Sequence, residues 1–193
     1  MVASSLNSYL TNNNEVININ INKNKESKLR KINQNGQIQI YQSSYRGSYS
    51  SIIRDSLRNA ALGRKVLLVQ LMKGGVKQGI SNAQKLCGNL TWIRSSNSYD
   101  QYESENITND ISKTINNSIT ELWDFCKKEL LSGEYDQIIL DEVFLAVKMN
   151  IISKDDLIST LENRFISGDI ILTGTSIPKN FLLMADQITE LRS

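Results

Sequence analysis

Two short apolar runs in the last third of the chain constrain its fold most strongly, because each run ends in residues suited to ligand binding. The run 138–140 is followed by Asp141 and Glu142, and the run 170–172 is followed by Thr173 and Gly174. A short apolar run with a polar end is typical of a buried parallel strand, whose carboxyl end faces the ligand crevice of an open α/β sheet. The pattern therefore predicts a nucleotide crevice at this end of the sheet.

Apolar spacing predicts alternating strands and helices along the rest of the chain. The two C-terminal runs are themselves strands. We expect further strands at 37–41, 65–72, 90–93 and 187–191, and helices at 50–62, 108–131, 143–168 and, in a short form, 181–186. Strands that alternate with helices form a mostly parallel sheet with helices on both faces. The predicted fold class is α/β.

Length and composition favour one domain preceded by an arm. The chain has 193 residues, of which 40% are hydrophobic, so it can bury one full core. Residues 1–35 are rich in Asn, Ser and Lys and carry a basic stretch at 23–31. This segment has too little apolar surface to repay its ordering, which predicts a flexible polar and basic arm before a single domain at 36–193.

Charge and composition exclude several classes of function. The 22 basic and 20 acidic side chains give a formal charge of +2, so nothing favours nucleic acid or an anionic membrane as a partner. No apolar stretch approaches the roughly 20 residues of a membrane span, and the start lacks the pattern of a signal peptide, so we expect a cytoplasmic protein. The sequence contains no histidine, which excludes a Ser-His-Asp triad and histidine-ligated zinc.

Four segments in order resemble the ATP:corrinoid adenosyltransferases, a P-loop NTPase-like family with a RecA-like fold. They are a strand ending in Lys73-Gly74, the acidic strand 139–142, the pair Thr173-Gly174 and the closing segment 185–192. The resemblance covers 36–192. It implies transfer of the 5′-deoxyadenosyl group of ATP to a Co(I) corrinoid, in cobalamin biosynthesis or salvage, with Mg²⁺ as cofactor.

The segment that corresponds to the family's phosphate-binding loop departs from the family pattern. Gly47 is retained, but Ser43 and Tyr45 replace glycines, Ser48 replaces the lysine and Tyr49 replaces the Mg²⁺-binding threonine. Backbone amides, a lysine and a hydroxyl are what such a loop uses to hold MgATP. Arg46 could restore the charge and Ser48 or Ser50 the hydroxyl. The resemblance makes these the nucleotide-binding candidates: Ser43, Ser44, Arg46, Gly47, Ser48, Tyr49, Ser50 and Arg58.

Most of the remaining candidates have a structural alternative. Asp141 and Glu142 suit Mg²⁺ as hard oxygen ligands, although Asp141 could merely cap the next helix. On the phosphate or substrate side, Lys73 and Gly74 could instead form a solvated turn. Arg58 fits a solvated helix face equally well. The remaining candidates are Thr173 and Gly174 on the phosphate or substrate side, and Tyr99 and Tyr102 on the corrinoid side, where a solvated loop is the alternative.

The resemblance leaves two functions open, of which adenosyl transfer is the leading one. One is adenosyl transfer with ATP, Mg²⁺ and a corrinoid in a homodimer. The other is a pseudoenzyme that binds a corrinoid, a nucleotide or a protein partner without turnover. Ile80 and Thr175, which replace a glutamate and an arginine of the family, favour the second, as does the altered loop. A third hypothesis, an unrelated P-loop NTPase, is disfavoured because the loop lacks its lysine.

Overall fold

The computed structural model describes residues 10–12, 15–18, 30–32, 35–46, 49–96, 109–165 and 167–191. The chain divides into two compact units, residues 1–35 and 36–193. The first unit contains a three-stranded antiparallel sheet in the order β1-β2-β3. Its strands are β1 (Leu10–Asn12), β2 (Glu15–Asn18) and β3 (Arg30–Ile32). The segments that join them lie outside the described residues, so the flexible arm remains a prediction.

The second unit is built on a seven-stranded sheet in the order β10-β4-β9-β8-β5-β7-β6. All neighbours are parallel except β6 and β7, which are antiparallel. This topology confirms the predicted α/β class and the mostly parallel sheet. The strands are β4 (Ile38–Ser43), β5 (Val66–Gln70), β6 (Gln84–Leu86), β7 (Leu90–Arg94), β8 (Gln137–Asp141), β9 (Asp169–Gly174) and β10 (Gln187–Leu191).

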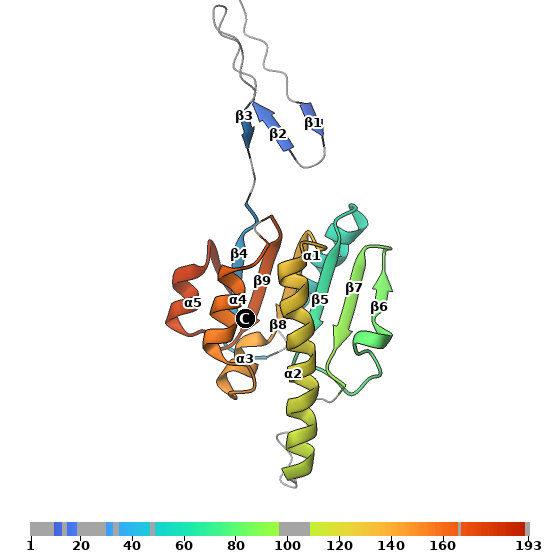
Figure 1. The fold of residues 1–193 in the computed structure, drawn as a ribbon, viewed down its shortest axis with the longest axis vertical. Helices are drawn as coiled ribbons and strands as arrows, with labels where there is room; N and C mark the ends of the chain where they lie inside the picture. Colours follow the sequence, from blue (N-terminus) through green and yellow to red (C-terminus); the bar gives the residue numbers. More distant parts are fainter. Residues whose placement is uncertain are drawn as a thin grey trace, which may run out of the picture. The chain divides into compact units, whose positions relative to one another are not determined.

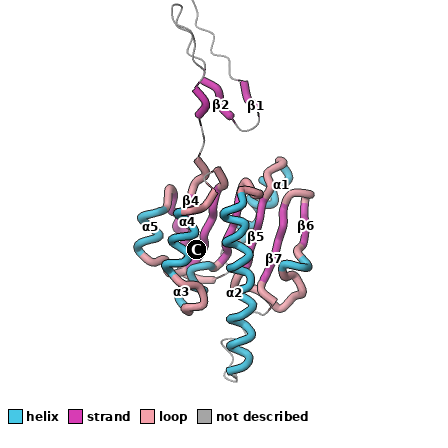
Figure 2. The backbone as a smooth tube through the Cα atoms, viewed as in Figure 1, coloured by secondary structure: helices cyan, strands magenta, loops and turns pink. Residues whose placement is uncertain are grey.

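Helices cover both faces of this sheet (Figure 1). One face packs against α1 (Ser50–Ala61) through a core that includes Ile52, Leu68 and Ile139. The opposite face packs against the remaining helices through a larger core. Figure 2 shows the long helix α2 crossing the strands on that side. The helices of this layer are α2 (Asn109–Ser132), α3 (Val143–Lys148), α4 (Lys154–Glu162) and α5 (Lys179–Met184).

Burial on both faces explains the central strands. Every residue of β5 and of β8 is buried, as expected for strands that lie between two layers of helices. The apolar runs that predicted these strands therefore mark the middle of the sheet. Their polar last residues, Gln70 and Asp141, are in register with each other at the carboxyl edge.

The predicted helix over 143–168 was wrong in one respect, because the segment forms two helices. Asn150 adopts a left-handed conformation (φ 56°), which an α-helix cannot continue through. Ser153 then starts α4 by accepting a hydrogen bond from the amide of Asp156. The sequence analysis also missed the short 3₁₀ helix η1 (Ile80–Asn82) and the edge strand β6.

Among the helices that the structure describes, none combines the length and the apolar character that crossing a membrane requires.

Candidate functional site

The carboxyl ends of β4, β9, β8 and β5 bring four of the predicted segments to one edge of the sheet. Parallel pairing places the loop after β4, the pair Thr173-Gly174, the pair Asp141-Glu142 and the turn at Lys73-Gly74 side by side. In an open parallel sheet this edge is where ligands bind. These four segments, which are far apart in the sequence between Ser43 and Gly174, therefore share one site.

Asp141 is buried and accepts three side-chain hydrogen bonds in the site. It is 2% exposed, and its Oδ2 accepts hydrogen bonds from Gln70 Nε2 at 2.8 Å and from Lys73 Nζ at 3.1 Å. Its Oδ1 accepts a hydrogen bond from Thr173 Oγ1 at 2.9 Å. Asp141 therefore does not act as a helix cap, and its negative charge is balanced by the neighbouring ammonium group.

Glu142 is held in an unusual backbone conformation. Its φ and ψ are 60° and 27°, in the left-handed region that non-glycine residues rarely occupy. Its amide donates a hydrogen bond to Thr173 Oγ1 at 2.7 Å. The hydroxyl of Thr173 thus accepts a hydrogen bond from the amide of Glu142 and donates one to the carboxylate of Asp141. It thereby fixes the two acids relative to each other.

Arg46 from the altered loop pairs with Glu142. Its Nε lies 2.9 Å from Oε1 and its Nη2 lies 3.0 Å from Oε2, a bidentate arrangement that fits guanidinium to carboxylate. Glu142 is 2% exposed and Arg46 31% exposed. The pair ties the loop after β4 to the end of β8, and a charge this deeply buried needs such a partner.

The acidic pair, as it stands, does not fit a Mg²⁺ ion. All four of its carboxylate oxygens already accept hydrogen bonds from protein donors, and both acids face cationic side chains. Mg²⁺ requires free oxygen ligands in near-octahedral geometry. Among the described residues, no three Asp, Glu or Cys side chains gather as a metal site would need. The assignment of Mg²⁺ to Asp141 and Glu142 stays a prediction.

Tyr49 fills the interior beneath the loop. It is 1% exposed and precedes α1 without making a side-chain cap. Burial, and next the charges of Asp141 and Glu142, raise the pKa of its hydroxyl to about 12. Main-chain groups of Ser43 and Gly174 come close enough to oppose that pKa shift. Within the described residues, however, the hydroxyl has no partner in hydrogen-bonding geometry.

The other loop candidates are less closely tied to the acids. Ser43 is buried and accepts a long hydrogen bond from the amide of Tyr45, at 3.4 Å, whereas Ser44 and Ser50 are exposed. Gly47 and Ser48 lie outside the described residues. The loop therefore presents Arg46 and the Tyr49 ring to the inside of the site.

Arg58 lies away from the site, and the two tyrosine candidates lie outside the described residues. Arg58 is exposed in the last turn of α1, eight residues from the helix start, or about 12 Å at 1.5 Å per residue. Tyr99 and Tyr102 lie outside the described residues, so their corrinoid role remains a prediction.

Gly174 has a packing reason to be glycine. A Cβ at this position would lie 2.7 Å from the Cβ of Phe144 and 3.0 Å from its Cδ2. The residue thus lets β9 approach α3 closely. This close approach explains the glycine of the Thr-Gly pair without any ligand.

Gln70 and Trp92 belong to the site although the sequence analysis did not select them. The side chain of Gln70 donates to Asp141 and accepts a hydrogen bond from Trp92 Nε1 at 3.1 Å. A polar residue at the end of an otherwise apolar buried strand was the available signal for Gln70. No local pattern marks Trp92, because its partner is distant in sequence.

Comparison with known proteins gives one family and several distant relatives. Residues 34–193 match the model of the family described as ATP:corrinoid adenosyltransferase BtuR/CobO/CobP. The chain is 23% identical over 165 residues to the corrinoid adenosyltransferase of Escherichia coli K12, covering 81% of this chain and 76% of that protein. It is 24% identical over 165 residues to corrinoid adenosyltransferase CobA of Salmonella typhimurium, with the same coverage of both chains. An uncharacterized Nostoc protein, all2391, is 26% identical over 170 residues, which span 44% of that protein.

Proposed function

Because this chain belongs to the ATP:corrinoid adenosyltransferase family BtuR/CobO/CobP, we propose that it binds that family's ligands at the carboxyl edge of its sheet with strongly impaired adenosyl transfer. The family uses ATP and a corrinoid, and its P-loop NTPase-like fold is the fold of this chain. The altered loop after β4 decides how much ligand binding and adenosyl transfer this chain retains.

The observation that carries the proposal is the bidentate pair of Arg46 with Glu142. This pair, together with the three donors on Asp141, gives the acids protein partners in place of a metal ion. At the positions where the family's loop carries its lysine and threonine, this chain has Ser48 and Tyr49. The charges that would hold a triphosphate are therefore reduced and internally paired.

The energetic cost of these changes sets the expected size of the impairment. A charge-assisted hydrogen bond contributes about 1.5–3 kcal/mol, so loss of the loop lysine alone corresponds to roughly 10- to 150-fold. Breaking the pair between Arg46 and Glu142 adds to this, because it leaves a buried carboxylate without a partner. We expect transfer at least about 100-fold slower than in a family member with an intact loop.

Full adenosyl transfer is the second candidate function. The specific observation that favours it is that Lys73 and Arg46, 30% and 31% exposed, each keep part of the side chain accessible beside the acids. If both turned towards the triphosphate, they could neutralise it and orient ATP, and the site could exclude water from the reacting groups. The corrinoid substrate supplies the nucleophile in this chemistry, so the lack of histidine is no obstacle. A homodimer in the cytoplasm is proposed from the family resemblance for either function.

An anaerobic assay with Arg46→Ala separates the two functions, because they predict opposite effects. The chain is mixed with chemically reduced corrinoid and MgATP, loss of Co(I) absorbance is followed, and a family enzyme with an intact loop serves as the positive control. If the Arg46–Glu142 pair keeps the acid from a metal ion, transfer is slow, and Arg46→Ala frees the Glu142 carboxylate for Mg²⁺ and tightens MgATP binding measured by calorimetry. If Arg46 replaces the lysine, transfer is fast and Arg46→Ala abolishes it.

Arg54→Ala is the matched control, since Arg54 is an exposed arginine on α1 that pairs only weakly, at 3.7 Å, with its neighbour Asp55. It should change neither transfer nor binding. The binding proposal fails if calorimetry detects neither ATP nor corrinoid binding to the wild-type chain or to Arg46→Ala.

A further inference from the structure

A polar row runs across the sheet at the edge that carries the site. Gln70 is in register with Asp141 on one side and with Arg94 on the other, so the three residues end β8, β5 and β7 on the same face of the sheet. Asp141 is already satisfied by Gln70, Lys73 and Thr173. Gln70 uses its amide nitrogen on Asp141 and its oxygen on Trp92. Arg94 is the end of the row.

The guanidinium of Arg94 is positioned by stacking. Its Cζ lies 4.7 Å from the centroid of the Trp92 ring, within the range of a cation–π contact. Trp92 is itself fixed by its hydrogen bond to Gln70. The indole thus holds the planar guanidinium in one orientation. The side chain of Arg94 therefore loses less conformational entropy when a ligand binds.

Arg94 has polar capacity that the described part of the chain does not use. Its Nε is buried and has no hydrogen-bond acceptor among the described residues. No described carboxylate forms an ion pair with it, in contrast to Arg46 and Lys73. Native proteins satisfy the great majority of buried donors, so this buried Nε calls for a partner, and a planar guanidinium suits a carboxylate or phosphate group.

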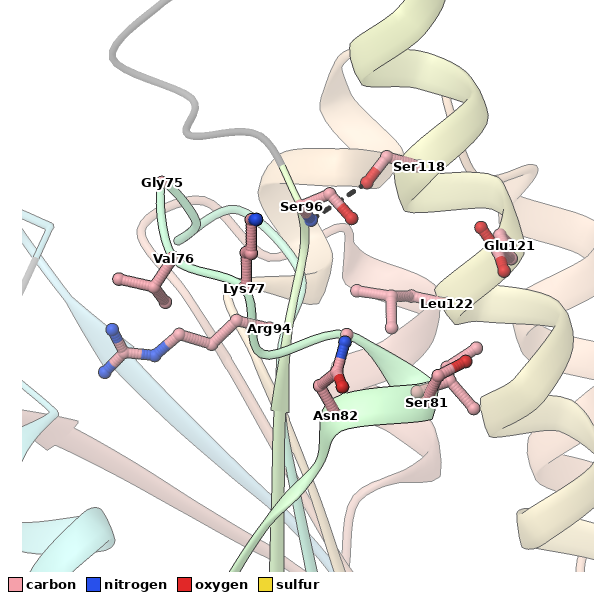
Figure 3. A pocket seen from close by; sticks show the side chains of 12 residues that line it. Gly75, Val76, Lys77, Ser81, Asn82, Arg94, Ser96, Ser118, Glu121 and Leu122 are labelled. Carbon is pink, nitrogen blue, oxygen red and sulfur yellow. Dashed lines mark hydrogen bonds between the residues drawn. The ribbon is translucent and has the colours of Figure 1, made fainter.

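The surroundings of Arg94 favour an anionic ligand. A pocket of about 450 Å³ lies on the α2 side of β7 and has Lys77, Arg94 and the acid Glu121 in its lining, but the guanidinium extends away from it. Figure 3 shows Arg94 running away from Ser118, Glu121 and Leu122 of α2, which lie on the other side of the strand. The acid therefore does not face the guanidinium, whose planar fork matches a carboxylate or a phosphate group.

We propose that Arg94, stacked on Trp92, is an anion-binding residue that receives a carboxylate or phosphate group of a ligand at the carboxyl edge of the sheet. This inference goes beyond the proposed function, because it needs neither adenosyl transfer nor a corrinoid. It also differs in place, since the acids next to the altered loop lie at the other end of the polar row.

The test uses two probes that separate the chemical sources of the charge. The full chain is titrated, without Mg²⁺ and at constant ionic strength, with sodium pyrophosphate in one arm and sodium citrate in the other. Tryptophan fluorescence reports binding, because Trp92 contacts the guanidinium while the other tryptophan, Trp123, is buried in α2. Calorimetry measures the same affinities independently.

Three variants test whether anion binding depends on the side chain of Arg94. Arg94→Gln should weaken binding at least tenfold, and Arg94→Lys, which keeps the charge without the fork, should give an intermediate loss. Arg54→Gln, the matched exposed arginine, should bind as wild type does. A circular dichroism spectrum and a thermal melt establish that each variant is folded, and Arg94→Lys serves as the test should Arg94→Gln fail to fold.

Each outcome of the two titrations either supports or overturns the anion-binding role of Arg94. Binding of pyrophosphate alone assigns the site to phosphate, binding of citrate alone assigns it to carboxylate, and binding of both means that Arg94 recognises charge in either form. Equal affinities in wild type and both Arg94 variants, or no saturable change with either probe, would overturn it. Neither result bears on adenosyl transfer, which is measured with corrinoid and ATP.

Discussion

The hydroxyl of Tyr49 is an unfavourable group at the centre of the site. It is buried beside Asp141 and Glu142, and within the described residues no hydrogen bond compensates its lost hydration. An unsatisfied buried hydroxyl costs about 1–3 kcal/mol. We therefore expect Tyr49→Phe to raise the free energy of unfolding by about 1 kcal/mol in urea titrations at neutral pH. A loss of stability would mean that the hydroxyl has a partner in solution.

The same residue predicts a loss of stability in alkali. The folded-state pKa of Tyr49 is raised to about 12, above the value of about 10 in an unfolded chain, so the folded protein resists its ionisation. The contribution of this raised pKa to the free energy of unfolding is fully present below about pH 10 and is lost as the pH rises towards the folded pKa. Unfolding free energies measured across that window should fall more steeply for wild type than for Tyr49→Phe. Parallel curves would contradict the assignment.

Gly174 offers a test of packing at the site. The Cβ of an alanine would overlap Phe144 of α3, and β9 is held between two strands and cannot shift freely. Overpacking of this kind costs about 1–3 kcal/mol, so Gly174→Ala should lower the urea midpoint. Gly79→Ala is the matched control, because its nearest neighbour is the Ser96 hydroxyl at 3.8 Å, and it should leave the midpoint unchanged.

At the scale of elements, Asp156 joins α4 to α2. Its Oδ2 accepts hydrogen bonds from Trp123 Nε1 at 2.7 Å and from Lys127 Nζ at 3.1 Å. Burial pulls the pKa of Asp156 upwards, but these two hydrogen bonds outweigh it and hold the pKa below the usual value. The ionised carboxylate is therefore one of the groups that fix the two helices to each other.

The depressed pKa of Asp156 predicts an acid-sensitive contribution to stability. A group whose pKa is lowered on folding stabilises the protein above its unfolded pKa, about 3.9, and this contribution disappears as the pH falls through the folded pKa. Asp156 is 39% exposed, so solvent screening limits its contribution. Asp156→Asn should cost about 0.5 kcal/mol at neutral pH, and the difference from wild type should shrink below about pH 4. Asp55→Asn, at an exposed acid of α1, is the matched control variant.

The elements themselves could largely be predicted from apolar periodicity, because burial on two faces imposes long apolar runs on β5, β8 and β9. The break between α3 and α4 was missed because the apolar spacing continues across it. Asn150 and the Ser153 cap were the local signals that should have ended one helix and begun another.

The partners within the site could not be predicted, because strand register decides them. Asp141, Gln70 and Arg94 become neighbours through pairing of β8, β5 and β7. No local pattern encodes that pairing. The sequence could place Asp141 at a strand end and identify Arg46 as a possible replacement for lysine. It could not show that Arg46 reaches Glu142.

At the scale of the whole molecule, the family match begins at residue 34, and the second compact unit begins at residue 36. That unit contains the seven-stranded sheet and both of its hydrophobic cores. Burial of apolar surface, the driving force for folding, is therefore available within this unit.

A chain that begins at Gly36 should therefore fold alone, with a thermal midpoint and near-ultraviolet circular dichroism close to those of the full chain. A chain that begins at Gln42 is the informative control, because it removes most of β4, which lies between β10 and β9, and should not fold. A large drop in midpoint for the Gly36 chain would mean that residues 1–35 contribute to the stability of the domain. An unchanged midpoint combined with weaker corrinoid binding would instead mean that residues 1–35 take part in binding the corrinoid.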